Sequence, residues 1–293
     1  MPHSPLFLMT DAEHFDVCYQ INPWMQPDAW RADPGVRRAA AVKASVDLRT
    51  ALEALGARTE SIKGVAGLPD LVFPANAAIV LDRRVLLARF RHPERQGEQP
   101  IFRDAFASLK LRGLVEEIHE LPDDVVQEGA GDCIWDNDRG FFWVGYGQRS
   151  TLNSISAIEK VFGRKTVALE LATEHFYHLD TCFCPLAGGK LLYYPAAFTR
   201  EALLTIHAHV RLEDRIVATD EEAGAFCVNA VNIGEHIIMA KPPDSLWEKL
   251  RAHGFTLTGI DLEPFILSGG GAYCMTLRLD RSSCGAEALA AAV

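Results

Sequence analysis

The segment of the sequence best suited to chemistry is a cysteine that follows a run of glycines. Residues 268–276 read Ser-Gly-Gly-Gly-Ala-Tyr-Cys-Met-Thr, which places the thiol at Cys274. Consecutive glycines cost backbone entropy and supply no packing, so they indicate that another group approaches the backbone closely. A thiol there is a candidate nucleophile if a neighbouring base lowers its pKa. The pattern also fits a buried strand residue after a bulge, because free cysteines are commonly buried.

A histidine and two carboxylates stand where the chain enters other apolar segments. His178 and Asp180 lie in Tyr-His-Leu-Asp-Thr, and strand alternation predicts that both point to one face. Such a pair offers a general base and a ligand for a cation, and structural ion pairs have the same pattern. Glu128 precedes Gly-Ala-Gly-Asp, where a carboxylate either orients a histidine or belongs to a capped turn.

The sequence gives little support for a cofactor or a metal. Cys182 and Cys184 lie near His175 and His178, but the Cys-x-Cys spacing lacks a second ligand pair, so we predict no metal site. There is no P-loop and no dinucleotide-binding fingerprint. The glycines at 269–271 are not followed by the helix that a phosphate cradle needs.

The elements that must position these side chains recur along the chain as an imperfect repeat. Each unit has an apolar strand, a turn, a second apolar strand and a helical stretch, with Gly, Asn and Asp at the turns. The predicted strand pairs are Leu71–Ala78 with Val85–Phe90, Asp132–Asp136 with Phe141–Tyr146, Thr181–Leu186 with Leu191–Tyr194, Ala225–Asn229 with His236–Ala240, and Ala272–Leu279 with Phe7–Met9. The predicted helices are Val36–Leu55, Phe102–Leu109, Thr151–Phe162, Thr199–Leu212 and Asp244–His253.

The period of the repeat favours a closed ring. Corresponding strand positions are 46 to 57 residues apart, at Asn76, Cys133, Cys182, Val228 and Cys274. Such a period is typical of propeller-like closure, in which each unit buries its apolar face only against its neighbours. An ordinary mixed α/β domain with recurring hairpins is the alternative. No Pro-rich or Ser-rich linker divides the chain, so we expect one domain over residues 1–293.

Composition and charge narrow the class of protein. The net charge of −10 argues against nucleic acid and anionic membranes as main partners. No apolar run reaches the roughly 18–20 residues that span a bilayer, and the first ten residues lack the pattern of a secretion signal. Seven irregularly spaced cysteines do not resemble a disulfide framework, which favours the cytoplasm. We expect disorder only in the Ala-rich tail after Cys284.

In their order, these motifs resemble those of the guanidine-modifying superfamily, which includes arginine deiminases, dimethylarginine dimethylaminohydrolases and amidinotransferases. The chain has Glu-Gly-x-Gly-Asp, then His-Leu-Asp-Thr, then a C-terminal Gly-Gly-Gly-x-x-Cys. The resemblance covers essentially the whole chain. It implies the pentein fold, an α/β class that is a five-bladed propeller of pseudo-repeated ββαβ units, in agreement with the repeat.

The resemblance also implies roles for individual residues. Cys274 would be the nucleophile, His178 the general acid/base and Glu128 the carboxylate that orients it. Asp180 would grip the guanidinium nitrogens, since one carboxylate can accept two N–H groups. Arg149, in Gly-Tyr-Gly-Gln-Arg-Ser, would bind the substrate α-carboxylate.

The N-terminal run points to one branch of the superfamily. The stretch from Met9 to Met25 looks like the opening of arginine dihydrolases, which convert arginine to ornithine, carbon dioxide and two ammonia. Asn22 in this stretch joins the expected substrate-binding residues, and Arg95 is a second candidate for the α-carboxylate.

Asn76 marks a departure from the deiminase pattern. Deiminases and dimethylargininases carry an aspartate there, whereas this chain has an amide, as in the dihydrolase-like branch. An amide both donates and accepts, so it suits a neutral ureido intermediate. The alternative is that the reaction stops at citrulline. We expect arginine or methylated arginine as substrate, no cofactor, and a chain compatible with a homo-oligomer.

Overall fold

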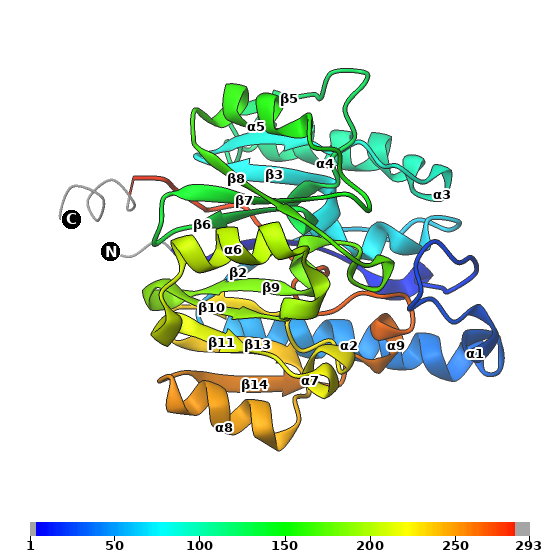
Figure 1. Cartoon of the computed structure of the whole chain (residues 1–293). Helices are drawn as coiled ribbons and strands as arrows, with labels where there is room; N and C mark the ends of the chain where they lie inside the picture. Colours follow the sequence, from blue (N-terminus) through cyan, green and yellow to red (C-terminus); the bar gives the residue numbers. More distant parts are fainter. Residues whose placement is uncertain (1–3, 285–293) are drawn as a thin grey trace.

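Residues 4–284 of the computed structural model are described here (Figure 1). The expected disorder after Cys284 concerns residues outside this range. Within it, the strands form five three-stranded sheets. No helix between residues 4 and 284 combines the length and the apolar character that crossing a bilayer requires.

Every sheet has the same topology. Its first strand pairs antiparallel with the second, the second pairs parallel with the third, and a helix forms the crossover between the parallel strands. The first two units are β3 (Ala78–Leu81), β4 (Arg84–Leu87), α3 (Pro93–Gln96), α4 (Glu98–Leu111) and β5 (Glu117–His119), then β6 (Cys133–Asp136), β7 (Phe141–Tyr146), α5 (Ser154–Phe162) and β8 (Thr166–Glu170). The next two are β9 (Phe183–Leu186), β10 (Lys190–Tyr193), α6 (Arg200–His209) and β11 (Arg215–Val217), then β12 (Val231–Ile233), β13 (His236–Ala240), α8 (Asp244–Ala252) and β14 (Thr256–Ile260).

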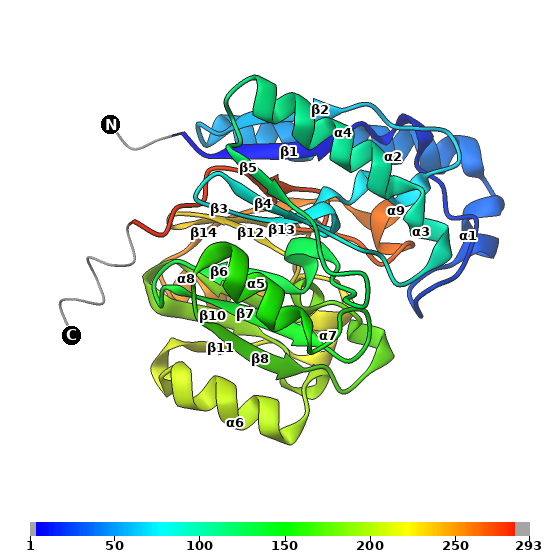
Figure 2. The same cartoon turned by 90° about the horizontal axis from the view of Figure 1, so that it is seen from above.

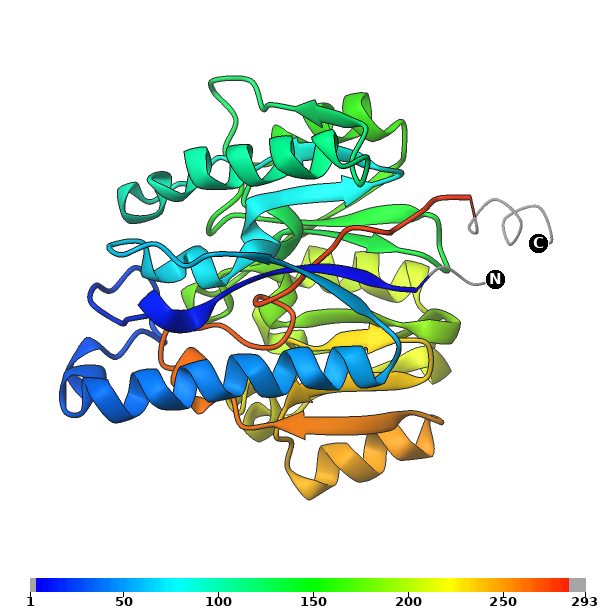
Figure 3. The same ribbon diagram turned by 180° about the vertical axis from the view of Figure 1, so that it is seen from behind.

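The fifth unit joins the two ends of the chain and closes the ring. It consists of β15 (Leu277–Arg278), β1 (Leu6–Thr10), α2 (Pro34–Ala54) and β2 (Arg58–Ile62). The predicted pairing of the C-terminal strand with Phe7–Met9 is confirmed, since Phe7 faces Arg278 and Leu8 faces Leu277. Figure 3 shows the C-terminal segment beside β1, with α2 alongside. The fold is therefore the five-bladed α/β propeller of ββαβ units that the repeat predicts.

The crossover helices lie on the outside of the ring, around the inner strands (Figure 2). In α2 the buried positions recur at helical spacing, at Ala41, Ala44, Ser45, Leu48 and Leu52, so one apolar stripe faces the sheets. The helix starts with Asp33 capping the N–H of Val36 and with Pro34 in its first turn, and it ends before Gly56 at φ +80°.

Short elements make up the rest of the described chain. The remaining α-helices are α1 (Pro27–Arg31), α7 (Asp220–Gly224) and α9 (Glu263–Ile266). The 3-10 helices are η1 (Ala12–His14), η2 (Pro69–Val72), η3 (Pro74–Ala77), η4 (Gly129–Gly131), η5 (Glu174–Phe176), η6 (Leu179–Thr181), η7 (Ala187–Gly189), η8 (Pro195–Ala197) and η9 (Leu212–Asp214).

The predicted inner strands begin too early, and this is the main error of the sequence analysis. Leu71–Ala78 is wrong as a strand because Pro69 and Pro74 start the 3-10 helices η2 and η3, and β3 begins only at Ala78. Ala225–Asn229 is likewise a turn, with Phe226 at φ +60°. Ala272–Leu279 contains only the two-residue β15. The five helices are confirmed, with shifted ends.

Candidate active site

The candidate active site forms where the entrances to the inner strands meet. The short helices η3, η4 and η6 precede β3, β6 and β9, and η4 contacts the other two. Turns at residues 226–229 and 271–276 take the same place before β12 and β15. Several polar side chains at these entrances are no more than 2% exposed, among them Asn76, Glu128, His178, Asp180, Asn229 and Cys274.

On one side of the site, the thiol of Cys274 contacts Asp180. Its Sγ donates to Oδ2 of Asp180 at 3.2 Å. Burial, reinforced by the charge of Asp180, raises the pKa of the Cys274 thiol. Burial also raises the pKa of the Asp180 carboxyl, to about 7. Oδ1 of Asp180 is buried and has no hydrogen-bond partner among residues 4–284, which leaves an acceptor for a donor from outside the protein.

Asn229 fixes the position of the thiol and of its backbone. Its Oδ1 accepts the N–H of Tyr273 at 3.0 Å and the N–H of Cys274 at 3.1 Å. Its Nδ2 donates to Sγ of Cys274 and to the carbonyl of Asp180, both at 3.1 Å. One amide therefore holds the candidate nucleophile to the strand entrance that carries its carboxylate.

On the other side, Glu128 orients the imidazole of His178. Nε2 of His178 lies 2.7 Å from Oε2 of Glu128, so we assign the proton of the neutral ring to Nε2. Nδ1 then carries a lone pair, and Nδ2 of Asn76 lies 3.5 Å from it in a donor position. An unprotonated Nδ1 is the form that a general base requires.

Glu128 is held as a carboxylate by the groups around it. Nη1 of Arg149 donates to its Oε2 at 3.1 Å, and the N–H of Arg91 donates to its Oε1 at 2.9 Å. Burial opposes ionisation, but Arg149 and His178 outweigh it and keep the pKa of Glu128 well below its usual range. The charge on Glu128 therefore persists at neutral pH and supports the Nε2–H tautomer of His178.

Arg149 connects this ion pair to the cavity. Its Nη2 donates to the carbonyl of Ile21 at 3.0 Å, and its guanidinium lies 4.6 Å from the ring centroid of Tyr177. Arg149 and Tyr177 both line a cavity that also contains Cys274 and Asn76. The predicted α-carboxylate ligand therefore stands at the cavity while it also neutralises Glu128.

Arg95 also lines this cavity, but its guanidinium is already paired with a carboxylate of the protein. Its Nε and Nη2 donate to the two oxygens of Glu98, both at 2.8 Å. Its Nη1 donates to Oδ1 of Asn76 at 2.8 Å. This contact fixes the amide of Asn76, so that the N–H₂ end, and not the oxygen, faces His178.

The glycines before Cys274 make room for close packing. A Cβ at Gly270 would lie 2.1 Å from the ring of Phe73, and one at Gly271 would lie 2.8 Å from Oδ1 of Asn229. Gly269 has φ +81°, and its carbonyl accepts from the hydroxyl of Tyr177 at 2.5 Å. The expectation of close backbone approach is confirmed, and a bulged strand is not what the glycines form.

Asn22 lines the cavity, and its side chain hydrogen-bonds two segments of the chain to each other. Its Nδ2 donates to the carbonyl of Ser268 at 3.1 Å, and its Oδ1 accepts from the N–H groups of Trp24 and Met25. The amide is thus committed to holding residues 22–25 against the glycine segment.

Sequence reasoning missed three residues that shape the site. Asn229 neighbours Val228, which the repeat aligns with Cys274, so its place in the period was the available signal. Asp70 lines the cavity and accepts from Ser268 Oγ at 3.1 Å. Tyr177 precedes His178 and stacks on Arg149, and no local motif marks it. Within residues 4–284, no three or more His, Cys, Asp or Glu side chains are grouped to hold a metal ion.

Comparison with known proteins identifies the family. The family model described as "N,N dimethylarginine dimethylhydrolase, eukaryotic" matches residues 20–281. The chain belongs to this family. The match confirms the resemblance to the guanidine-modifying superfamily that the order of the motifs indicates.

Relatives of known name fall on two branches of the superfamily. The bifunctional arginine dihydrolase/ornithine cyclodeaminase ArgZ of Synechocystis sp. is 41% identical over 272 residues, which are 93% of this chain and 37% of ArgZ. The N(G),N(G)-dimethylarginine dimethylaminohydrolase of Mycobacterium tuberculosis is 33% identical over 278 residues, 95% of this chain and 87% of that protein. The chain thus spans little more than a third of ArgZ, the relative on the dihydrolase branch.

A solved structure of ArgZ matches the fold as well. The crystal structure of its N-terminal domain, bound to product, has a TM-score of 0.87 and 39% identity to this chain. The match covers 96% of this chain and 99% of that domain. This agreement confirms the fold class.

Proposed function

We propose that the chain is an arginine dihydrolase, which hydrolyses the guanidinium group of L-arginine to ornithine, carbon dioxide and two ammonia. One observation carries the proposal. A buried thiol, Cys274, touches a carboxylate whose second oxygen is unpartnered, and an imidazole oriented by Glu128 belongs to the same buried cluster. Structures of the N-terminal domain of ArgZ, one with product and one of a cysteine-to-serine variant with substrate, support this proposal.

Asp180 is the group we assign to the guanidinium. Its free Oδ1 accepts an N–H of the substrate, and its charge complements the cation. The bound cation also offsets the negative charge that raises the pKa of Cys274. Substrate binding therefore favours the thiolate, which is the nucleophilic form. We assign Arg149 to the α-carboxylate, with Arg95 as the second candidate and Asn22 as the residue that shapes the wall.

The first half of the reaction converts arginine to citrulline. The thiolate of Cys274 forms a C–S bond with the guanidinium carbon, and a terminal C–N bond breaks as His178 delivers the thiol proton to the departing ammonia. The product of this step is an S-alkylthiouronium. Water that loses its proton to Nδ1 of His178 then adds to the same carbon, and the C–S bond breaks to restore the thiol.

The second half repeats this chemistry on the neutral ureido carbon. Cys274 adds again, the remaining terminal nitrogen leaves as ammonia, and a second water cleaves the resulting thiocarbamate. The carbamate of ornithine then loses carbon dioxide. Across both halves, arginine and two waters give ornithine, carbon dioxide and two ammonia, so atoms and electrons balance without an oxidant or a reductant.

Asn76 is the residue we connect with the second half. Its oxygen is bound by Arg95, and its Nδ2 points toward Nδ1 of His178. The neighbour of the imidazole is therefore an uncharged donor. A carboxylate at this position would favour a cation, whereas a donor N–H also suits the carbonyl oxygen of citrulline.

Product analysis tests the proposal directly. Purified protein is incubated with L-arginine, and ornithine, citrulline and ammonia are quantified over time. We expect ornithine with two equivalents of ammonia. Citrulline as the sole product with one equivalent would overturn the dihydrolase assignment while keeping the thiol chemistry.

Cys274→Ser separates chemistry from binding. A hydroxyl is a far weaker nucleophile here, so we expect turnover to fall by about 10⁴-fold or more. Arginine binding by calorimetry and the unfolding temperature should stay near those of the wild type. Full activity in this variant would remove Cys274 from its assigned role.

Dimethylarginine is the second candidate substrate, because the matching family and the Mycobacterium tuberculosis relative carry that name. Dimethylamine release from asymmetric dimethylarginine at a rate above that of ammonia release from arginine would favour it. Transfer of the amidino group to glycine would instead indicate an amidinotransferase. Tight arginine binding without any product would indicate a non-catalytic binding protein.

The setting we infer is the cytoplasm. All seven cysteines are free thiols, and the proposed nucleophile must stay reduced. The negative net charge supports neither nucleic acid nor an anionic membrane as a partner, and we infer a small-molecule substrate. A homo-oligomer is compatible with this fold, and size-exclusion chromatography with light scattering would establish its number of copies.

A further inference from the structure

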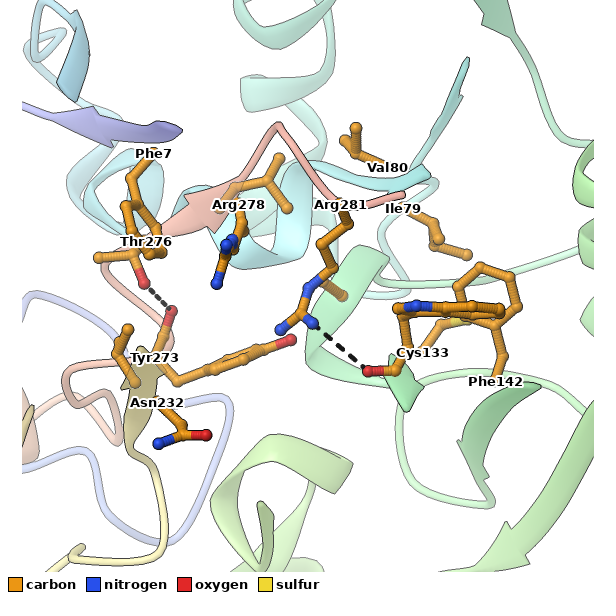
Figure 4. Close-up of a pocket in the computed structure, with 14 residues that line it drawn as sticks. Phe7, Ile79, Val80, Cys133, Phe142, Asn232, Tyr273, Thr276, Arg278 and Arg281 are labelled. Carbon is orange, nitrogen blue, oxygen red and sulfur yellow. Dashed lines mark hydrogen bonds between the residues drawn. The ribbon is translucent and has the colours of Figure 1, made fainter. Parts of the chain in front are cut away.

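A second cavity lies at the other end of the inner strands. The candidate active site uses residues that precede these strands, whereas this cavity is lined by the turns that follow them, at residues 136–138, 186–187 and 234. Its outer part has a volume of about 640 Å³, within the range of small-molecule sites. Its inner end has about 30 Å³ (Figure 4), enough for a water or a group of similar size. Both parts share Trp135, Asn232, Tyr273, Arg278 and Arg281.

Arg281 is an ion without a counterion in this cavity. Its Nη1 donates to the carbonyl of Trp135 at 3.5 Å, which is the longest distance that a hydrogen bond allows, and no carboxylate between residues 4 and 284 pairs with it. Its side chain is half-buried, and the partial loss of water lowers the pKa of Arg281. A cation that is partly withdrawn from water and has no carboxylate beside it gains from an accompanying anion.

The backbone around Arg281 holds the guanidinium in place. The carbonyl of Arg281 accepts the N–H of Asp82 at 2.9 Å. The carboxylate of Asp82 accepts both the N–H and the hydroxyl of Ser283, at 2.7 and 2.6 Å. The segment is therefore held by Asp82 at Arg281 itself and two residues later, so that the Arg281 side chain extends into the cavity from a fixed backbone.

Tyr273 supplies a second donor at the same point. Its hydroxyl makes no hydrogen bond to any residue from 4 to 284, and Figure 4 shows its ring and Arg281 directed into one space. Burial raises the pKa of Tyr273, so the phenol keeps its proton. The guanidinium of Arg281 and the hydroxyl of Tyr273 face the same small volume, and a single acceptor there would bind both donors.

The acidic groups nearby are engaged or distant. Arg278 is paired with Asp280 at 3.0 and 3.1 Å. Asp136 is bound by Arg139 at 2.7 Å, and Asp138 lines only the outer part. No carboxylate lines the inner end, where Arg281 and Arg278 are the ionised groups. The potential at the inner end is therefore positive, while the outer mouth is mixed.

We propose that the inner end of this cavity binds a small monovalent anion, either a halide or the carboxylate of a small organic acid, between the guanidinium of Arg281 and the hydroxyl of Tyr273. The anion would supply the counterion that Arg281 lacks. A carboxylate would place its two oxygens on the two donors, and its carbon chain would extend into the wider outer part. The site is separate from the α-carboxylate position at Arg149, which lies at the opposite end of the inner strands.

Two measurements on the full chain test the site. Crystals grown in sodium bromide should show an anomalous peak within hydrogen-bonding distance of Arg281 and Tyr273, and Arg281→Gln crystals should lack it. In parallel, the unfolding temperature is followed as bromide or acetate replaces a bulky sulfonate at constant ionic strength. The wild type should respond saturably, and Arg281→Gln should bind the anion about tenfold or more weakly.

Matched controls separate this site from other effects. Arg278→Gln removes a guanidinium that Asp280 already neutralises, so its response to anions should stay within about twofold of the wild type. Arg149→Gln removes acetate binding at the candidate active site and should keep the bromide peak. A response to bromide alone assigns the site to inorganic anions, and one to both extends it to carboxylates. An ordered Arg281 with no bromide peak beside it, or an unchanged response in Arg281→Gln, would overturn the proposal.

Discussion

The two sides of the candidate active site differ in how their charges are paired. On the imidazole side, each charged group has a partner of opposite charge. On the thiol side, a carboxylate contacts a thiol, and one carboxylate oxygen has no hydrogen-bond partner within residues 4–284. Glu128 is bound by Arg149 and His178, and Arg95 is bound by Glu98. Asp180, in contrast, receives only the thiol of Cys274 and leaves Oδ1 without a partner within residues 4–284.

The pKa shifts of Glu128, Asp180 and Cys274 follow this division. The pKa of Glu128 lies well below its usual range because charge pairing outweighs burial, while the pKa values of Asp180 and Cys274 are raised because burial dominates. One side is thus organised by protein groups alone, and under the proposed function the substrate cation would complete the other. The thiol of Cys274 would then gain its charge only when a guanidinium is bound.

Glu128→Gln should show the largest effect of the variants on the imidazole side. The amide can no longer fix the Nε2–H tautomer, and turnover should fall by about 10²–10⁴-fold. The free energy of unfolding should also drop, by about 3–5 kcal/mol, because Arg149 is left buried without its partner. Steady-state kinetics and denaturant unfolding measure the two effects.

The stability difference between the wild type and Glu128→Gln should depend on pH. The folded pKa of Glu128 is lowered, so its contribution is fully present above the unfolded value of about 4.3 and is lost as the pH falls toward the folded value. Asp136→Asn is the control, since it breaks another buried pair, with Arg139, away from the site. A loss of turnover in Asp136→Asn as large as in Glu128→Gln would contradict the assignment of Glu128 as the carboxylate that orients His178.

Asp180→Asn should lower the catalytic efficiency and yet raise the rate at which the Cys274 thiol is alkylated. Losing the charge that grips the guanidinium should lower kcat/KM for arginine by about 10²–10³-fold. Removing the same charge lowers the pKa of Cys274, so alkylation by iodoacetamide at pH 8 should be faster than in the wild type. Asp132→Asn, whose carboxylate binds Leu179 and Ser150, should leave alkylation unchanged. Slower alkylation in Asp180→Asn would contradict the conclusion that the charge of Asp180 raises the pKa of Cys274.

Asn229→Ala should move thiol reactivity in the opposite direction. The amide N–H at 3.1 Å stabilises the thiolate, so its removal raises the pKa of Cys274 and slows alkylation. We expect turnover to fall by about 10–100-fold and stability by about 1–3 kcal/mol, because two backbone N–H groups lose their acceptor. Asn232→Ala removes another hydrogen-bonded amide of the same unit and should reduce stability without changing alkylation.

Much of this site could be predicted from the sequence because its chemistry is carried by ionisable side chains in local motifs. Cys274, His178, Glu128 and Asp180 each stand at the entrance of a repeated unit, and closing the ring brings equivalent entrances together. The period of the repeat favoured a ring, and the resemblance of the motifs to the guanidine-modifying superfamily supplied the roles of these residues.

The remaining details depend on contacts that the sequence does not encode locally. The entrances are as buried as the strands they precede, so hydrophobicity alone made Leu71–Ala78 read as a strand although Pro74 starts a 3-10 helix there. Asn229 has the residue type of an ordinary turn, and its contact with Cys274 spans 45 positions. The pairing of Arg95 with Glu98 likewise became evident only from the geometry.

Asn76→Asp should have the smallest effect on the consumption of arginine and the sharpest effect on the product. A carboxylate beside Arg95 and Nδ1 of His178 favours a cationic substrate over a neutral one. We expect arginine loss within about tenfold of the wild type, since the thiol side is untouched, with citrulline replacing ornithine as the main product.

Asn76→Ala completes this test because it removes the amide without adding a charge. If the neutral donor to the ureido oxygen is what permits the second attack, Asn76→Ala should also release citrulline. If both variants release ornithine with two equivalents of ammonia, Asn76 does not control the second step. The control would then lie on the thiol side, where Asp180 and Asn229 contact Cys274.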